Sequence, residues 1–195
     1  MTIKFATLGP AGSNHDLNTR RYIAFRKVKD AEIIYIEHFF DAVDMIRNGT
    51  ADYAVQVCAH PDVAPTIERH YKDVFLADCW IGKTKEMGVL TRADVDKPRS
   101  VGYMIATAGY FRPEEWEEQY NTLSNADTAR RLLAGEFDSG FTALEIADQF
   151  PGRFRIDKII GRVDVVWLLY GGQQTNVGDI LAWPDAPVAK EMSVE

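Results

Sequence analysis

The stretch "DAVDMIRNGTADYAV", residues 41–55, carries the clearest signal for the fold. Its first part places apolar side chains at helical spacing and ends at Gly49, a residue type that readily takes the left-handed conformation that closes helices. The part after Gly49 is a short apolar run typical of a buried strand. A helix that leads directly into a strand is half of a βαβ unit, so the stretch predicts an α/β fold.

A second stretch, "DTARRLLAGEFDSGF" at residues 127–141, has the same pattern. In both stretches Asp is the first residue, Gly the ninth and Asp the twelfth. We expect Asp41 and Asp127 to cap the two helices, and Gly49 and Gly135 to end them. The repeat predicts two similar α/β lobes.

Short apolar runs alternate with helical segments along most of the chain. Strands are expected at 3–8, 31–39, 51–57, 99–105 and 137–142, and helices at 14–27, 41–49, 107–120, 126–135 and 143–150. This alternation predicts mostly parallel sheets flanked by helices. We assign residues 1–78 and 164–195 to lobe one and residues 79–163 to lobe two. The ligand cleft is expected between the lobes, because open α/β sheets bind ligands at their strand tips.

Composition narrows the classes of function. The chain has 195 residues, 46% of them apolar, and a net charge of −7, which argues against nucleic acid as a partner. No apolar run reaches the roughly 18 residues needed to cross a membrane, and no secretory leader precedes the first strand, so a cytoplasmic location is expected. The two cysteines and four histidines show no metal-ligand spacing, so no metal is expected. The tail at 184–195 is expected to be loosely held.

The stretch "TLGPAGSNHDL", residues 7–17, joins a strand to a helix through a glycine-containing turn. The first N–H groups of a helix lack internal partners and carry partial positive charge, so such a turn can bind an anion. Gly12, Ser13 and Asn14 are the candidate anion-binding residues. The alternative is that Ser13 or Asn14 only caps the helix. The turn alone leaves both interpretations open.

Three segments carry a resemblance to a known family. "TLGPAGS", "FFDAVDMIRNGTADYAVQV" and "SNADTARRLLAGEFDSGFT" resemble the catalytic domain of prephenate dehydratase over roughly residues 3–172. The resemblance implies a two-lobed fold of the type II periplasmic-binding-protein kind and a lyase that needs no cofactor. The regulatory domain often fused to that enzyme is not expected here.

The chain departs from the family at its site motifs. Where the family has Thr-Arg-Phe, this sequence has Val165, Val166 and Trp167. The family's Pro-x-Glu-Asn-Ser turn is replaced by "VCAHPD", and its Ser-His-Pro turn by the segment that begins at Tyr103. The endings "WLLYG" and "TALEIADQF" are more similar to the prephenate decarboxylases of antibiotic pathways, such as the bacilysin enzyme.

These departures favour one reaction over another. Dehydration of prephenate needs an acid for the leaving hydroxyl and donors for two carboxylates, and valine supplies neither. Decarboxylation needs an apolar wall, which Val165, Val166 and Trp167 could form, and a proton for a ring carbon. The catalytic candidates are His60, Cys58 and His15. The candidates for substrate binding are Gly12, Ser13, Asn14, Tyr103, Thr107, Ser124, Asn125, Thr142 and Trp167. Each has a structural alternative as a helix cap, a solvated residue or a core residue.

Three hypotheses remain open at this point. The first is a lyase acting on prephenate or a related cyclohexadiene carboxylate in specialised-metabolite (antibiotic) biosynthesis. The second is a prephenate dehydratase of phenylalanine biosynthesis. The third is a cytoplasmic module that binds or senses a small acid. All three expect an anionic small molecule as partner, and a homodimer is left open.

Overall fold

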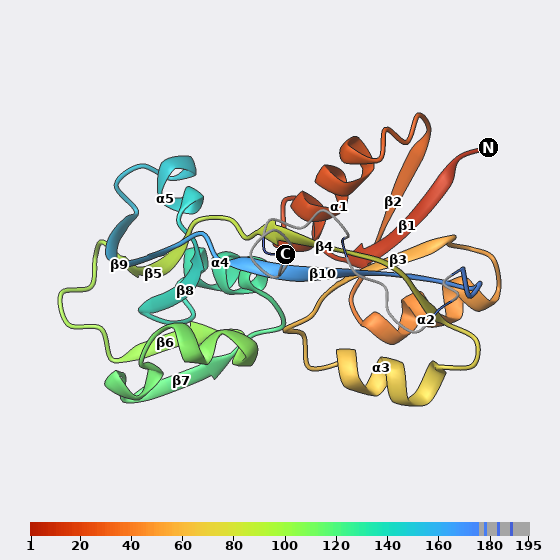
Figure 1. Cartoon of the computed structure of the whole chain (residues 1–195). Helices are drawn as coiled ribbons and strands as arrows, with labels where there is room; N and C mark the ends of the chain where they lie inside the picture. The colour runs from red at the N-terminus through yellow and green to blue at the C-terminus, as the bar shows by residue number, and fades with distance from the viewer. Residues whose placement is uncertain (176–177, 179–182, 184–187, 189–195) are drawn as a thin grey trace, which may run out of the picture.

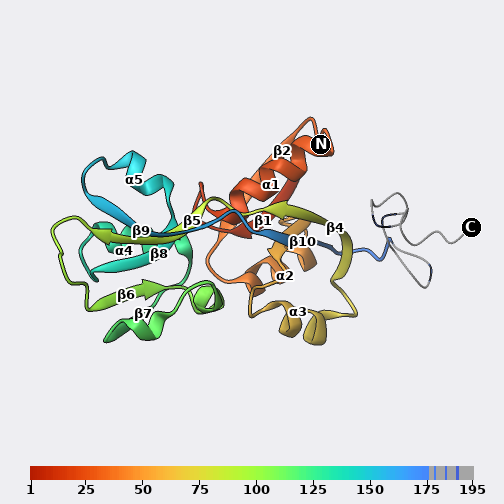
Figure 2. The ribbon, with the colours of Figure 1, turned by 60° about the vertical axis from the view of Figure 1, so that its left-hand side comes forward.

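The computed structural model describes residues 1–175 and, beyond these, only residues 178, 183 and 188. The tail at 184–195 therefore lies almost wholly outside the described residues. Two lobes lie side by side, each built on one five-stranded sheet (Figure 1). Figure 2 shows the same two lobes joined by the long strands that cross between them.

The first sheet contains the N-terminal strands. Its strands are, from edge to edge, β2 (Ala31–Ile36), β1 (Ile3–Leu8), β3 (Tyr53–Val57), β10 (Asp164–Gly171) and β4 (Phe75–Lys83). Helix α1 (Asn14–Phe25) covers one face, and α2 (Phe39–Arg47) and α3 (Val63–His70) lie on the other (Figure 1). Phe5, Val55 and Trp167 belong to the buried cluster on the α1 side. The lobe therefore buries apolar side chains on both faces of its sheet.

The second sheet has the same number of strands. In order they are β7 (Glu118–Asn121), β6 (Ser100–Tyr103), β8 (Ser139–Ala143), β5 (Met87–Arg92) and β9 (Phe154–Gly161). Helices α4 (Asn125–Leu133) and α5 (Glu145–Gln149) and the 3-10 turns η1 (Ile105–Tyr110) and η2 (Pro113–Glu115) complete the lobe. Leu90, Leu132 and Phe137 are buried together in one of its two clusters.

Each sheet is mixed, for the same reason in both lobes. The parallel pairs lie within each lobe: β1 pairs in parallel with β2 and β3, and β6 pairs in parallel with β7 and β8. The strands that carry the chain between lobes pair antiparallel: β10 with β3 and β4, and β5 with β8 and β9. The α/β fold with helix-flanked sheets is therefore as predicted, with antiparallel pairs added by the crossing strands.

The two crossings between lobes are hydrogen-bonded to each other. The Thr84 N–H donates to the Val163 carbonyl (2.9 Å), and the Val163 N–H donates to the Thr84 hydroxyl (3.0 Å). The sequence placed the first lobe boundary after residue 78, but β4 stays in the first sheet to Lys83. No turn-forming pattern follows residue 78 within β4, so the sequence did not indicate where the strand ends.

The expected helix at 107–120 is wrong. This segment forms η1, η2 and the edge strand β7. Pro113 has no N–H to donate, so an α-helix cannot continue through it. The next residues pair in parallel with β6 instead, for example Gln119 with Val101. Trp116 is half-buried and donates its indole N–H to the Ser139 hydroxyl (3.1 Å).

The internal repeat is visible in backbone detail. Gly49 and Gly135 both have positive φ, +74° and +79°, as expected for left-handed helix ends. The aspartates at the twelfth position also act alike. The Asp52 carboxylate accepts the Lys4 N–H (2.8 Å), and the Asp138 carboxylate accepts the Arg99 N–H (2.8 Å). Each of the two aspartates therefore ties its strand to the neighbouring parallel strand.

The expected helix caps need correction. Helix α2 starts at Phe39 after His38, and α4 starts at Asn125 after Ser124. Asp41 and Asp127 therefore lie in the first turns rather than at the cap positions, because the N-caps, His38 and Ser124, are three residues earlier than the expected ones.

Candidate functional site

A cavity of about 560 Å³ lies between the two lobes. Lobe one contributes the loop after β1, the start of α1, the loop after β3 and the inner face of β10. Lobe two contributes η1, the start of α4 and part of β8. The cavity therefore lies at the strand tips and helix starts of both lobes.

The helices that begin at the cavity start with nearly the same four residues, "SNHD" at 13–16 and "SNAD" at 124–127. In α1, the Ser13 hydroxyl accepts the Asp16 N–H (3.2 Å), and the Asp16 carboxylate accepts the Gly12 N–H (2.8 Å). This is a variant of the capping box: Asp16 accepts the N–H of Gly12, the residue before the N-cap, rather than that of the N-cap Ser13.

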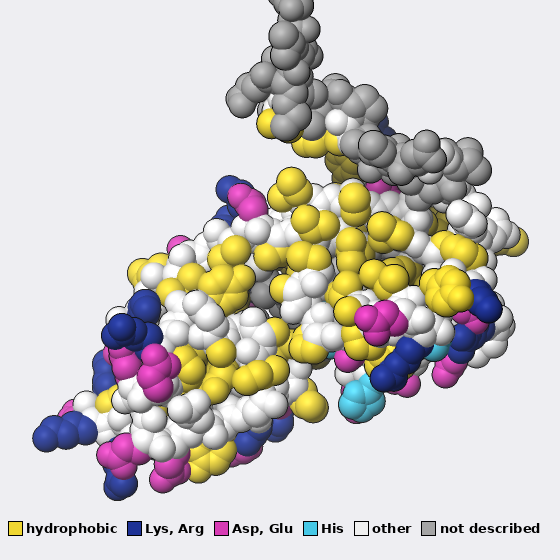
Figure 3. Space-filling model, turned by 60° about the horizontal axis from the view of Figure 1, so that its bottom comes forward, with side chains coloured by type: hydrophobic (Ala, Val, Ile, Leu, Met, Phe, Trp, Pro, Cys, Tyr) yellow, Lys and Arg dark blue, Asp and Glu magenta, His cyan; other side chains and the backbone are white. Residues whose placement is uncertain are grey.

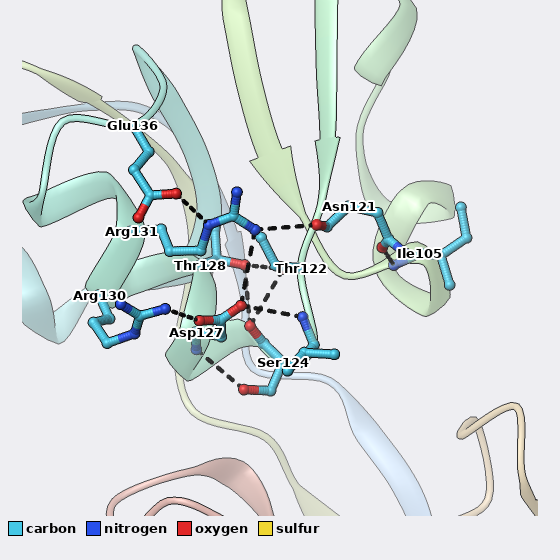
Figure 4. Close-up of polar contacts among 10 residues, drawn as sticks. Ile105, Asn121, Thr122, Ser124, Asp127, Thr128, Arg130, Arg131 and Glu136 are labelled. Atoms are coloured by element: carbon cyan, nitrogen blue, oxygen red, sulfur yellow. Dashed lines mark hydrogen bonds and ion pairs between the residues drawn. The ribbon is translucent and has the colours of Figure 1, made fainter. Parts of the chain in front are cut away.

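Helix α4 has the same arrangement. The Ser124 hydroxyl accepts the Asp127 N–H (3.1 Å), and the Asp127 carboxylate accepts the Leu123 N–H (3.2 Å) (Figure 4). The cavity-facing helices of the two lobes therefore begin with the same pair of capping hydrogen bonds.

The capping boxes leave two backbone donors free at each helix start. Within residues 1–175, the N–H groups of Asn14 and His15 in α1 and of Asn125 and Ala126 in α4 have no acceptor. Free N–H groups in the first turn carry the positive end of the helix dipole. The two free N–H groups in each lobe can therefore bind one carboxylate.

Two histidines and a tryptophan meet on the lobe-one wall. The ring centroids of His15 and His60 are 6.3 Å apart, and those of His15 and Trp167 are 5.2 Å apart, both nearly perpendicular. The Trp167 indole N–H donates to the Gly82 carbonyl (3.2 Å), which holds the ring in place. The His15 Nε2 atom is buried and has no partner in the described part of the chain.

Both imidazoles are neutral near pH 7. Burial, together with the smaller effect of the nearby His60, lowers the pKa of His15 to about 3. Burial also lowers the pKa of His60, although the Asp62 carboxylate opposes the shift. The Asp62 backbone N–H donates to His60 Nδ1 (3.2 Å). A neutral imidazole that accepts at Nδ1 carries its proton on Nε2, so His60 is a hydrogen-bond donor through Nε2.

The remaining wall is largely apolar and aromatic. Its apolar and aromatic members include Ile36, Met87, Met104, Tyr110, Phe141, Val165 and Trp167. The Tyr110 and Phe141 rings stack with centroids 5.9 Å apart. Among described residues, the charged side chains that line the cavity are Glu37, Asp127 and Arg130.

No model of a protein family matches this chain, and no curated protein matches it in sequence. Solved structures match it in three dimensions. A prephenate dehydratase from Arthrobacter aurescens, in complex with L-Phe, has a TM-score of 0.64 and 15% identity, over 97% of this chain and 70% of its own. An ABC transporter structure from Parabacteroides distasonis has a TM-score of 0.56 and 13% identity, over 87% of this chain and 66% of its own.

The periplasmic domain of BvgS from B. pertussis also matches, with a TM-score of 0.58 and 15% identity. That match covers 89% of this chain but only 37% of the BvgS chain. Identities this low show the fold alone. The chain has a two-lobed periplasmic-binding-protein-like fold.

Eight of the twelve candidate residues line the interlobe cavity of this periplasmic-binding-protein-like fold. They are Ser13, Asn14, His15, His60, Thr107, Ser124, Asn125 and Trp167. Several of them already have partners. The Asn14 carboxamide accepts the Lys85 N–H (2.6 Å) and donates to the Met87 sulfur (3.7 Å), and the Thr107 hydroxyl donates to the Met104 carbonyl (2.7 Å).

Four candidate residues lie elsewhere. Gly12 is exposed and its N–H is bound to Asp16. Cys58 is exposed, Tyr103 donates its hydroxyl to Gln119 (2.8 Å), and Thr142 donates to the Asn125 carbonyl (2.6 Å).

Strand alternation explains three of these four positions. The residues next to them, Val57, Met104 and Phe141, line the cavity instead. Successive side chains at a strand end point to opposite faces, so one residue of displacement removes a side chain from the site.

The Ser13 hydroxyl is also occupied. It accepts from Asp16 and donates to the Leu8 carbonyl (3.2 Å), and the Ser13 N–H donates to Pro10 (3.1 Å). The free donors at this helix start are therefore the N–H groups of Asn14 and His15, one position beyond those expected around Gly12 to Asn14.

Sequence reasoning missed several cavity residues. Tyr110 lies in the segment expected to be helical, Met104 at the end of the expected strand at 99–105, and Arg130 in the expected helix at 126–135. The repeated "SN-x-D" motif at 13–16 and 124–127 was a usable signal, because it marks the two helix starts that face each other across the cavity.

Proposed function

We propose that this protein is a cofactor-free lyase that acts on prephenate or a related cyclohexadiene carboxylate without making the ring aromatic. The observation that carries the proposal is the pair of neutral imidazoles, His15 and His60, beside an apolar wall in the interlobe cavity. The proposal places the chain with the bacilysin-type decarboxylases rather than with the dehydratases. It also includes a cytoplasmic location and a role in antibiotic biosynthesis.

The cavity matches the needs of decarboxylation. The bond between the ring and its carboxylate breaks, carbon dioxide leaves, and the electron pair passes into the ring diene. A ring carbon then takes a proton, for which the Nε2–H of His60 is the donor, and solvent restores that proton. A neutral imidazole can serve as an electrophile or donor of this kind. An apolar wall, with Val165 and Trp167, favours conversion of the carboxylate to a neutral product.

Substrate would be held by the helix starts. The side-chain carboxylate of the substrate would bind the free N–H groups of α1 or α4, which need no side-chain cation. The ring would pack against Trp167 from lobe one and Tyr110 from lobe two.

Ordinary dehydration has less support. Val165 supplies no acid to protonate a leaving hydroxyl. Val166 lies outside the cavity lining and is 37% exposed.

Figure 3 views the face toward which α3 lies, where hydrophobic side chains gather. Exposed apolar side chains of α3, β4 and β10 include Ile67, Ile81 and Val166.

A binding module is the second candidate. The fold is shared with an ABC transporter structure, and the cavity is built from both lobes, so ligand binding without turnover would use the same walls.

Incubation of the purified protein with prephenate, followed by NMR of the products, separates these functions. A non-aromatic dihydro-hydroxyphenylpyruvate supports the proposal, phenylpyruvate supports dehydration, and saturable binding without product supports a binding module. His60→Gln should reduce turnover by about a hundredfold or more, the usual contribution of a proton donor. Cys58→Ser is the matched control, because Cys58 is exposed and outside the cavity.

A further inference from the structure

We propose that Arg130 holds a carboxylate of the ligand at the start of α4. Arg130 would thereby supply the side-chain cation that this chain lacks at position 166, where it has a valine. The inference rests on the proposed function only in expecting a ring acid as ligand.

Arg130 is the one lysine or arginine among the described residues that line the cavity. The motif comparison put a valine, Val166, where the dehydratase family has an arginine, and that valine does not line the cavity. A carboxylate in this cavity therefore has a single side-chain cation within the described wall.

The Arg130 side chain reaches back toward the first turn of its helix. Its Nη2 atom lies 2.6 Å from Asp127 Oδ1 (Figure 4). Asp127 is in the same turn as the free N–H groups of Asn125 and Ala126. The guanidinium and two unpaired backbone donors thus stand at one end of α4, together with the Asp127 carboxylate that now pairs with the guanidinium.

The present partner of Arg130 is easily exchanged. The Arg130 side chain is 69% exposed, and an exposed ion pair three residues apart on a helix contributes little to stability. Asp127 keeps its capping bond to Leu123 without Arg130. The neighbouring Arg131 is different: it is 22% exposed and bound to Glu136 (2.7 Å) and to the Asn121 carbonyl (3.2 Å). Arg130 is the arginine of this pair that is free to turn to a ligand.

A second feature indicates what the ligand carries beside its carboxylate. The Asn125 Oδ1 atom is buried and has no donor in the described part of the chain. A buried acceptor without a donor is costly, so a ligand hydroxyl at this point would be favoured. The subsite therefore fits a hydroxylated ring acid.

Binding is tested by calorimetric titration of two acid–amide pairs that have the same size and shape, in which the amide replaces a charged oxygen with a neutral NH2 group: 4-hydroxybenzoate with 4-hydroxybenzamide, and phenylacetate with phenylacetamide. The wild-type protein should bind each acid more tightly than its amide. Arg130→Gln should weaken binding of the acids about tenfold or more and leave the amides unchanged, because a hydrogen bond to a charged group is lost. Arg130→Lys should recover part of the preference, since it keeps the charge but loses the two-point contact.

Arg99→Gln is the matched control. Arg99 is 68% exposed and lies 2.6 Å from Glu117, so it equals Arg130 in exposure and pairing but lies outside the cavity. This variant should keep the wild-type preference. Equal binding of acids and amides by the wild type, binding of neither, or an unchanged preference in Arg130→Gln would overturn the assignment.

Prephenate turnover, measured on the same proteins, separates this inference from the proposed function. If the wild-type protein turns over prephenate and Arg130→Gln does so equally well, the role of Arg130 is refuted and the lyase is supported. Loss of the acid preference in Arg130→Gln without any prephenate turnover would support Arg130 and refute the lyase.

Discussion

The imidazole rings of His15 and His60 lie 6.3 Å apart, centroid to centroid, at an angle of 83°. His15 comes from the first turn of α1, and His60 from the loop that leads to α3. Burial lowers the pKa of both rings, and the neighbouring His60 adds to the effect on His15, so both rings are uncharged near pH 7.

Stability should fall as the pH drops below about 6.5. Burial lowers the pKa of His15 to about 3, whereas a histidine in the unfolded chain titrates near 6.5. Between these two pKa values, His15 is protonated in the unfolded state and neutral in the folded state. The free energy of unfolding therefore decreases as the pH falls. From pH 6.5 to 5 the loss should be up to about 2 kcal/mol, at about 1.4 kcal/mol per pH unit.

Urea unfolding at several pH values measures this loss, with His15→Gln as the comparison. The variant should show a flatter dependence over the same window. Asp16 and Asp138 do not contribute there, because burial raises their pKa less than their hydrogen bonds lower it, and their stabilisation is lost only below about pH 4. An equal slope in both proteins would show that His15 is charged in the folded state.

Ser13→Ala should lower stability and leave ligand affinity almost unchanged. The Ser13 hydroxyl caps α1 and donates to Leu8, so it is not free for a ligand. The expected loss is about 1 kcal/mol, typical of a helix cap. Ser124→Ala should behave alike, because it caps α4 in the same way. A melting curve and a calorimetric titration on each variant test this, and a tenfold loss of affinity with unchanged stability would reverse the interpretation.

Asn14→Ala should weaken the connection between α1 and the segment that leads into lobe two. The Asn14 carboxamide accepts the Lys85 N–H and donates to the Met87 sulfur, and loss of the first bond leaves a half-buried donor unpaired. We expect a loss of about 1–3 kcal/mol in the free energy of unfolding. Asn125→Ala is the matched control at the same position of α4. Its carboxamide oxygen has no partner among the described residues, so that variant should lose much less.

Restoring the family's motif should not restore dehydration. In the double variant Val165→Thr and Val166→Arg, the hydroxyl would enter the cavity wall, but the arginine would lie on the face where Val166 is exposed. Phenylpyruvate should therefore stay at the wild-type level when prephenate is supplied. The single variant Val165→Thr serves as the control, and phenylpyruvate production in the double variant alone would show that position 166 reaches the substrate.

Much of the fold could be read from local patterns. The repeat at 41–55 and 127–141 predicted two lobes, and the left-handed glycines at 49 and 135 ended their helices as expected. The segment at 107–120 could not be read in this way. Its residues suit a helix locally, but Pro113 and pairing with β6 turn its end into a strand. Pairing of that kind depends on a strand distant in sequence, which local propensity does not encode.

Within the part of the chain that the structure describes, no helix is long and apolar enough to cross a membrane. The two-lobed architecture and the strand-to-helix turn at 7–17 were determined by the sequence itself. They follow from short-range physics: hydrophobic periodicity, helix caps and the conformational freedom of glycine.

Only the tertiary structure decided which side chains meet in the cleft. It placed His60 in the cavity wall and Cys58 outside the cavity, exposed, although a single residue separates the two. It also brought His15 beside His60 and turned Arg130 toward the first turn of α4. These outcomes depend on strand register, helix starts and the docking of one lobe on the other, where a shift of one residue exchanges a side chain in the site for one in solvent.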